Sequence, residues 1–370
     1  MHSNWRPLGR FFMENRAQKY YFAGKWLGIM TDIFDKLLIL RSPGVGPVAY
    51  EKLIRQFGSV AAAADSVRGN ATLVDAVSRE LDVAEKIGAR FIADDDPMYP
   101  LSLKNVKGHP PVISVRGNLE TLTRPAVAIV GTRHATAAGM GLVADLAENF
   151  AAHSVAVVSG MAIGTDTAAH HGALRADGCT QTIAVLGGGV DYIWPLENES
   201  LYYEIIERGA VVSEMPIGFV PRGTNFVQRN RWIAGIAQKV ILSEADLNSG
   251  SMRTAEFALE YARELWAVPS HPSDSRAAGP NHLIATGRAK LCSGVADFFD
   301  DGSKVVKNNV DKQKNSESEN ALLDALGTIP VSESVLADVV KKSVSEIKRD
   351  LVVLELRGLV RKTTNGYVRV

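Results

Sequence analysis

Six apolar runs in the middle of the chain constrain its fold more than any other feature. The runs are VAIVGTR (127–133), VAVVSG (155–160), IAVLGGG (183–189), VVSE (211–214), VILSEA (240–245) and WAVPS (266–270). Continuous β-branched runs without polar alternation are typical of strands buried on both faces, as in parallel sheets. Because helical stretches alternate with them, the sequence predicts βαβ units and an α/β, doubly wound, mostly parallel sheet.

The ends of these predicted strands indicate where a ligand would bind. In an open parallel sheet, ligands bind in the crevice beyond the carboxyl ends of the strands. Those ends carry Gly, Ser and Thr here, so a ligand can come close to the main chain. Thr136 and Thr165 stand where they would cap the helices that follow two of the strands. We therefore expect a binding crevice at this edge of the sheet.

Composition narrows the class of protein. A chain of 370 residues is expected to form about two to three domains. Its 41 basic and 41 acidic residues exclude a uniformly basic nucleic-acid-binding protein but not a local basic patch. Cys179 and Cys292 lie far apart, which predicts neither a disulfide framework nor a zinc site and fits a reducing cytoplasm. No run approaches the ~20 apolar residues of a membrane helix, so we expect no membrane association.

Changes in composition mark the domain boundaries. Residues 1–30 lack the apolar segment of a signal peptide and are interpreted as a disordered extension, or as sequence upstream of a true start at Met30. Residues 31–90 are predicted to form a small helical domain of the SAM-like or helix–hairpin–helix type. Its Gly44–Pro47 turn suits a DNA phosphate or a tight connection between helices. Residues 91–299 are expected to hold the sheet and an extension onto it.

The last part of the chain has a different character. Residues 300–319 are polar and charged, which is typical of a linker. Residues 320–370 predict three helices followed by two short β runs, with a hairpin turn at Asn365-Gly366. The expected N-caps of the second and third helices are Ser332 and either Ser343 or Ser345. This is the order of elements in a winged helix, for which DNA binding, a protein-interaction role and a vestigial role all stay open.

A glycine-rich segment, Gly160–Asp166, leaves one predicted strand and begins a helix. Glycines admit a ligand to the main chain, and the first N–H groups of a helix bind anions. The segment is neither a Walker A motif nor a GxGxxG dinucleotide motif with an acid ~20 residues further on. Arg133, at the end of the preceding strand, adds a guanidinium suited to a phosphate. Asp166 is interpreted as a helix cap rather than a general base.

The segment PRGTNFVQRNRWIAG is the second candidate contact. Its Arg222, Arg229 and Arg231 surround Phe226. Cations that follow a backbone, beside rings that stack on bases, suit single-stranded nucleic acid. Trp232 is assigned to the core instead.

A further helix start at Asn248–Ser251, with Thr254, forms a second candidate anion site. No Ser/His/Asp or Cys/His arrangement has informative spacing, and no metal-ligand cluster occurs. His170 and His171 lie inside a predicted helix, where one is expected to face the core and the other the solvent. The sequence therefore predicts no catalytic residue, no metal and no cofactor.

Taken in order, these motifs resemble the DNA-processing protein A family (DprA, also called Smf). The matching stretches are IVGTR, SGMAIGTDTAAHHGAL, TIAVLGGGVDYIWPLEN, SEMPIG, FVQRNRWIAG, NSGSMRTAEFA, WAVPSHP and GPNHLIATG. The resemblance implies a Rossmann-like domain that binds single-stranded DNA and forms a homodimer, with a helical N-terminal and a winged-helix-like C-terminal domain. It also implies a role in loading the RecA recombinase during natural transformation, without an enzymatic reaction.

The resemblance also implies roles for residues at matching positions. Arg133 would hold a DNA phosphate, Phe226 and Arg229–Arg231 would shape the groove, and glycines and serines would line the pocket. The candidate DNA- and phosphate-binding residues are Gly131, Thr132, Arg133, Ser159, Gly160, Gly164, Thr165, Asp166, Gly187, Gly189, Arg222, Phe226, Arg229, Asn230, Arg231, Ser249, Gly250, Ser251 and Thr254. This sequence has Val227 where the family commonly has Pro, and Ser270 where Gly is common; neither departure removes a phosphate contact.

Two other functions fit a similar fold. The LOG-type nucleotide phosphoribohydrolases need a PGGxGTxxE run at a strand end. Here Ser249 and Ser251 replace glycines and Glu256 stands one residue too near Thr254, which argues against hydrolysis. A nucleotide-sensing regulator would keep the pocket but bind duplex DNA through its winged helix.

Overall fold

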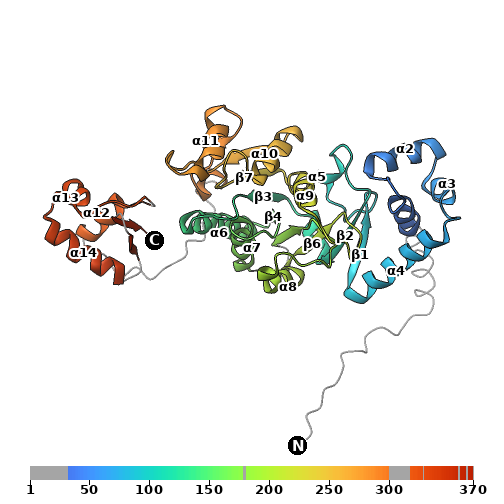
Figure 1. Cartoon of the computed structure of the whole chain (residues 1–370), viewed down its shortest axis with the longest axis horizontal. Coiled ribbons are helices and arrows are strands. Elements are labelled where there is room, and N and C mark those ends of the chain that lie inside the picture. Colours follow the sequence, from blue (N-terminus) through green and yellow to red (C-terminus); the bar gives the residue numbers. More distant parts are fainter. Residues whose placement is uncertain are drawn as a thin grey trace, which may run out of the picture.

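A computed structural model describes residues 32–177, 181–299, 317–327, 329–356, 359–363 and 366–369 (Figure 1). The predictions made for residues 1–30, for Cys179, for most of the 300–319 linker and for Asn365 lie outside these described residues. No helix in the described ranges is long and apolar enough to cross a membrane.

The centre of the molecule is a nine-stranded sheet with the order β1-β2-β6-β5-β4-β3-β7-β8-β9. The strands are β1 (Ala89–Ala93), β2 (Val112–Gly117), β3 (Ala126–Val130), β4 (Ala156–Ser159), β5 (Thr182–Val185), β6 (Ala210–Ser213), β7 (Lys239–Leu242), β8 (Glu264–Ala267) and β9 (Lys290–Leu291). All neighbours from β6 to β9 are parallel, whereas β1 and β2 extend the β6 edge antiparallel. Every predicted apolar run forms a strand, and the mostly parallel sheet is confirmed.

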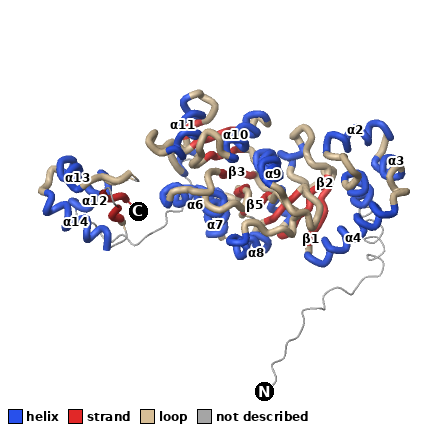
Figure 2. Tube along the Cα trace, viewed as in Figure 1, coloured by secondary structure: helices blue, strands red, loops and turns tan. Residues whose placement is uncertain are grey.

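Helices cover both faces of the sheet, as Figure 2 shows. They are α5 (Leu101–Lys104), α6 (Ala137–Ala152), α7 (Thr165–Arg175), α8 (Glu199–Arg208), α9 (Gly223–Ile236), α10 (Gly250–Glu260) and α11 (Ala278–Ala285), with short 3₁₀ turns η1 (Leu119–Thr123), η2 (Leu196–Asn198), η3 (Ser275–Ala277) and η4 (Val295–Asp297). Successive strand residues point to opposite faces. Thus Ala128 and Val130 of β3 pack with Trp232 of α9, whereas Val127 and Ile129 pack with α6 and α7. Trp232, 3% exposed, is a core residue as predicted.

The strand order reverses direction between β3 and β7. From β3 the chain adds β4, β5 and β6 on one side, then returns to place β7 and β8 on the other. Loops at such a switch point diverge and leave a crevice beyond the carboxyl ends of the strands. The loops that follow β3, β4 and β7 therefore meet at one place.

The N-terminal unit is helical, as predicted. It consists of a helix over residues 32–40, α2 (Pro47–Phe57), α3 (Val60–Asp65) and α4 (Ala71–Ile87). Proline begins α2 directly after Gly46, because its fixed backbone suits a first helical position. The helices share a core that also contains Ala93 of β1 and Val112 of β2, so this unit packs on the antiparallel edge of the sheet.

The C-terminal unit has its own core and the predicted order of elements: α12 (Glu317–Ala325), α13 (Glu333–Val340), α14 (Val344–Leu356), β10 (Val360–Thr363) and β11 (Gly366–Arg369). The first helix begins at Glu317, inside the predicted linker. Ser332 caps α13, and Ser343 rather than Ser345 caps α14. The two predicted β runs pair as an antiparallel hairpin, β10 with β11, but Gly366 pairs with Thr363 as the first residue of β11, whereas the sequence predicted it in the turn. The winged-helix assignment stays a prediction.

Candidate nucleic-acid interface

A cavity of about 400 Å³ lies at the switch point between β3 and β7. Its walls come from the loops after β3, β4 and β7 and from α9 and α10. The predicted site residues that line it are Gly131, Thr132, Arg133, Asp166, Phe226, Arg229, Asn230, Ser249, Gly250, Ser251 and Thr254. The sequence thus located the crevice, and the geometry separates residues that face it from residues that support it.

Arg133 is the exposed cation at this edge. No carboxylate in the described part of the chain forms an ion pair with it. Its guanidinium carbon lies 5.3 Å from the ring centroid of Trp194, and the Trp194 and Phe226 rings lie 4.4 Å apart with a 42° tilt. Arg133, Trp194 and Phe226 therefore form a row of one cation and two rings beside the cavity, suited to a phosphate next to bases.

Trp194 was not among the predicted site residues. It lies in the WPLEN part of a stretch that carried the family resemblance, and it immediately precedes Pro195. Because the tryptophan is far along the chain from both Arg133 and Phe226, only the folded structure brings the three together.

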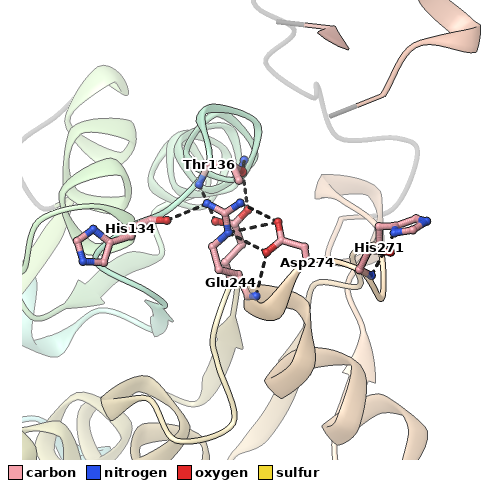
Figure 3. Close-up of polar contacts among 8 residues, drawn as sticks. His134, Thr136, Glu244, His271 and Asp274 are labelled. Atoms are coloured by element: carbon pink, nitrogen blue, oxygen red, sulfur yellow. Dashed lines mark hydrogen bonds and ion pairs between the residues drawn. The ribbon is translucent and has the colours of Figure 1, made fainter. Parts of the chain in front are cut away.

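The start of α6 is already occupied by a carboxylate of the protein. Thr136 caps this helix as predicted, its hydroxyl accepting a hydrogen bond from the Gly139 amide at 2.9 Å. The buried Glu244 carboxylate accepts hydrogen bonds from the Thr136 amide, at 2.7 Å, and from the Thr136 hydroxyl. Figure 3 shows Glu244 and Thr136 in contact, with Asp274 and His134 nearby. This helix start therefore has little capacity left for an outside anion.

The glycine-rich loop before α7 is closed in the same way. The Asp166 carboxylate accepts hydrogen bonds from the amides of Gly160, at 3.2 Å, and Ala162, at 3.3 Å. Asp166 is buried, and this burial raises the pKa of its carboxyl above the usual range. The interpretation of Asp166 as a helix cap is therefore wrong: it closes the loop that precedes α7, and one of the amides that it uses belongs to Gly160, a predicted phosphate-binding residue.

Two other predicted residues of this loop lie behind the cavity. Thr165 is the first residue of α7 rather than its cap, and its hydroxyl donates to the Thr132 carbonyl at 3.1 Å. Gly164 has a φ of 83°, and a Cβ there would lie 2.6 Å from the Arg133 carbonyl oxygen. Both residues join the loops after β3 and β4. Ser159 is fully buried and donates to the Ile129 carbonyl, so it links the two strands themselves.

The start of α10 differs from both. Ser249 precedes this 11-residue helix, and no side chain caps its N–H groups. The Ser249 and Ser251 hydroxyls lie 2.9 Å apart at the cavity wall, and Asn230 donates to the Gly250 carbonyl at 3.1 Å. An uncapped helix start carries partial positive charge and free N–H donors, which bind anions. Of the three helix starts, this one is open to the cavity.

Arg229 lines the floor of the cavity as a buried cation. It is 6% exposed, and its guanidinium donates to the Gly160 carbonyl at 2.7 Å and to the Val185 carbonyl. Burial lowers the pKa of Arg229 to about 10, so it stays charged at neutral pH, and Asp166 is the nearby counter-charge. Its donors hold the ends of β4 and β5 together.

The remaining predicted positions do not line the cavity. Arg231 pairs with Glu214 at 3.1 Å and lies over the Trp232 ring, so its role as a groove contact stays a prediction. Arg222 is exposed just before α9. Gly187 packs against Phe226, and Gly189 packs against Asp191, so both glycines give room to neighbouring side chains.

Comparison with known proteins decides the family. The model of the DNA recombination-mediator protein A family matches residues 90–302, and that of the DprA-like N-terminal HHH domain matches residues 31–69. The chain belongs to the DprA (Smf) family. The second match agrees with the helical N-terminal unit in the structure.

Relatives in this family are similar over most of the chain. Protein Smf of Synechocystis is 34% identical over 255 residues, which cover 68% of this chain and 57% of that protein. Protein Smf of Escherichia coli is 32% identical over 77% of this chain and 79% of its own. The DprA structure from Streptococcus pneumoniae, 31% identical, superposes with a TM-score of 0.57 and covers 71% of this chain and 91% of its own. A Helicobacter pylori DprA structure, 30% identical with a TM-score of 0.52, covers 57% of this chain and 93% of its own and is described as having a unique single-stranded DNA binding mode.

In this member of the DprA family, the histidine that lines the cavity is His134, and within the described residues its ring forms no hydrogen bond or ion pair with a carboxylate or a hydroxyl. His170 is fully buried against the Thr182 hydroxyl at 2.7 Å, and burial lowers the pKa of this imidazole to about 3, whereas His171 is exposed. Glu256 pairs with Arg253 on the exposed side of α10. No group of three or more His, Cys, Asp or Glu side chains in the described ranges could hold a metal ion.

Proposed function

We propose that this chain binds single-stranded DNA along the cavity between β3 and β7. The uncapped start of α10 and the guanidinium of Arg133 hold backbone phosphates, and the rings of Phe226 and Trp194 contact the bases. The observation that carries the proposal is a contrast. No side chain caps the start of α10 and no carboxylate in the described residues pairs with Arg133, whereas Glu244 and Asp166 already bond to amides at the start of α6 and in the loop before α7.

Single-stranded rather than duplex DNA fits this arrangement. A ring can stack only on a base whose face is exposed, and bases in a duplex are stacked on one another. In the row of Arg133, Trp194 and Phe226, the cation and the rings lie close enough to contact the phosphate and the base of the same nucleotide. The Helicobacter pylori relative described with a single-stranded DNA binding mode supports this choice.

We also propose that the site acts by binding, without a reaction or a cofactor. The carboxylate that lines the cavity is Asp166, and its oxygen is bound to two loop amides. Hydrolysis of a nucleotide on this fold needs an acid on the helix after β7. Glu256 of α10 is not among the lining residues and pairs with Arg253. Release of free base from a nucleoside monophosphate, followed by chromatography, would contradict this part of the proposal.

The family relationship extends the proposal to partners. We propose that the DNA-bound protein acts as a homodimer in the cytoplasm, where it protects incoming DNA and helps to load the RecA recombinase during natural transformation. Family membership supports these partners, and the matching regions of the relatives cover from 57% to 79% of their lengths. Co-sedimentation of the protein with RecA on a single strand tests the partnership.

The deciding experiment is a salt-dependent titration with a thymidine oligomer, the matching duplex and a nucleoside monophosphate. The proposal predicts tight binding of the single strand, weak binding of the duplex, and a slope of log affinity against log salt of about −0.7 for each phosphate held. Equal affinity for duplex and single strand, or a flat salt response, contradicts it. Tighter binding of duplex than of single strand favours the regulator that binds DNA through its C-terminal unit.

A further inference from the structure

Glu244 holds both ends of the loop that carries Arg133. At the start of the loop, the Glu244 carbonyl accepts a hydrogen bond from the Thr132 amide at 2.6 Å. At the end, its carboxylate accepts from the Thr136 amide at 2.7 Å and from the Thr136 hydroxyl. Arg133 lies between these two anchors. One residue at the end of β7 therefore fixes the loop after β3 across the switch point.

The Glu244 carboxylate is closely packed. Glu244 is 8% exposed, and a Cβ at Gly139 would lie 2.7 Å from its Oε1, so the first turn of α6 closes directly over it. On the other side, Arg276 donates to the His134 carbonyl at 3.2 Å and is itself paired with Asp274 at 2.8 Å (Figure 3). The loop is thus fixed at Thr132, His134 and Thr136, the residues on either side of Arg133.

The Arg133 side chain forms no hydrogen bond or ion pair within the described residues, and its cation–π contact there is with the face of Trp194. Its position at the cavity therefore depends on the backbone of its loop rather than on bonds to its own side chain. A long side chain on a mobile loop loses conformational freedom when it binds a phosphate, and a prearranged loop reduces that loss. The anchors at Thr132 and Thr136 supply the prearrangement.

We propose that Glu244 is the positioning residue of the DNA site, setting the place of Arg133 through the loop 131–136 without touching the DNA. This inference rests on the proposed function. The positioning role predicts a change in DNA affinity opposite to the one that electrostatic repulsion alone predicts. Removing a carboxylate near a phosphate site should strengthen DNA binding, whereas loss of a positioning residue weakens it.

Glu244→Gln tests whether loss of the carboxylate weakens or strengthens DNA binding. Glutamine keeps the size of the side chain, but its amide is neutral: the oxygen can still accept from the Thr136 amide and the NH2 group can only donate to the Thr136 hydroxyl, so both bonds lose the strength that the carboxylate charge gives them. We expect roughly tenfold weaker binding of a thymidine oligomer, in the range measured for coupled pairs. The salt slope should fall by about 0.7, the value of one phosphate contact on a single strand. Glu256→Gln, the same charge change on the exposed face of α10, is the control, and it should bind equally or more tightly.

A double-mutant comparison with Arg133 separates a positioning role from a general loss of structure. In an Arg133→Ala background, Glu244→Gln should weaken binding no further, because the residue that it positions is gone. Equal losses in both backgrounds overturn the proposal, as does binding by Glu244→Gln that matches or exceeds that of the parent. Thr136→Val and Thr136→Ser give an independent pair: the valine should reproduce the loss and the serine, which keeps the hydroxyl, should restore binding.

Amide hydrogen exchange makes the test independent of DNA. Glu244→Gln should speed exchange in residues 131–139 and leave α10 unchanged, because only the loop and the start of α6 depend on the carboxylate. Unchanged exchange in 131–139 overturns the positioning role even when the protein binds DNA. Faster exchange in a protein that binds no single strand supports the positioning of the loop and contradicts only the proposed function.

Discussion

The loop Gly160–Asp166 and the turn Asn248–Ser251 look alike in sequence, yet they differ in the folded protein. Both contain glycine beside small or polar residues, both follow a strand of the sheet, and both lead into a helix. In the first, Asp166 fills the amides of the loop; in the second, no side chain caps the helix. A helix start is therefore a site for a ligand anion only when the protein supplies no anion of its own.

Of the changes that test this comparison, charge reversal at Arg133 should have the largest effect on DNA affinity. Arg133→Glu places a carboxylate beside the open start of α10, and we expect single-strand affinity to fall on the order of a hundredfold. Fluorescence anisotropy with a labelled oligomer measures it. Arg253→Glu, on the exposed side of the same helix, is the matched control and should cost far less. Equal losses in the two variants would remove Arg133 from the site.

Removing the Asp166 carboxylate should free the loop amides that it now bonds, so that an outside anion can bind them. Asp166→Ala leaves two loop amides without an acceptor and Arg229 without its counter-charge, and should destabilise the protein by about 1–3 kcal/mol. Sulfate should recover part of this loss, because it binds the vacated amides of the folded state only. Thermal unfolding with and without sulfate measures both effects. Asp145→Ala, a carboxylate far from the loop on α6, should show neither.

Adding a carboxylate at the start of α10 should have the reverse effect and cap the helix. Ser249→Asp supplies a capping carboxylate to α10 and should stabilise the helix by about 0.3–1 kcal/mol. The same carboxylate competes with DNA, so we expect roughly tenfold weaker binding of a single strand. Ser249→Asn caps the helix without charge and should weaken binding less. Unaltered affinity in Ser249→Asp would mean that phosphate binds elsewhere.

A last prediction, which concerns folding rather than DNA binding, is a dependence of stability on pH through His170 of α7. Burial lowers the pKa of this imidazole from 6.5 to about 3. The unfolded chain takes up a proton at a pH where the folded chain does not, so stability falls as pH drops below 6.5. Chemical denaturation at neutral and mildly acidic pH should give a shallower fall for His170→Asn. His171→Asn, at an exposed position, should leave the fall unchanged.

The sheet and the position of the crevice could be predicted because local sequence encodes them. Val127 to Val130 and the other apolar runs have strand propensity, and their polar ends mark the edge at which parallel strands finish. The Thr136 cap was also predictable, since its partner amide at Gly139 lies within one helical turn. Each of these depends on neighbours in the sequence.

The features that the sequence did not specify depend on residues far apart in the chain. Thr165 has the residue type of a cap, but its hydroxyl bonds to Thr132 on another loop. Arg229 and Arg231 are two residues apart in α9, so they point in different directions: one is buried among strand ends and the other pairs with Glu214. Trp194 joins Arg133 only through the fold. Partners distant in sequence decide which residues face the cavity, and composition and spacing do not specify them.

Amide hydrogen exchange with and without a thymidine oligomer tests the central claim most directly. The account predicts slower exchange on DNA binding in residues 249–253 at the open start of α10 and in residues 131–134 around Arg133. It predicts no change in residues 160–163, whose loop Asp166 already closes. Protection of 160–163 without protection of 249–253 would contradict it.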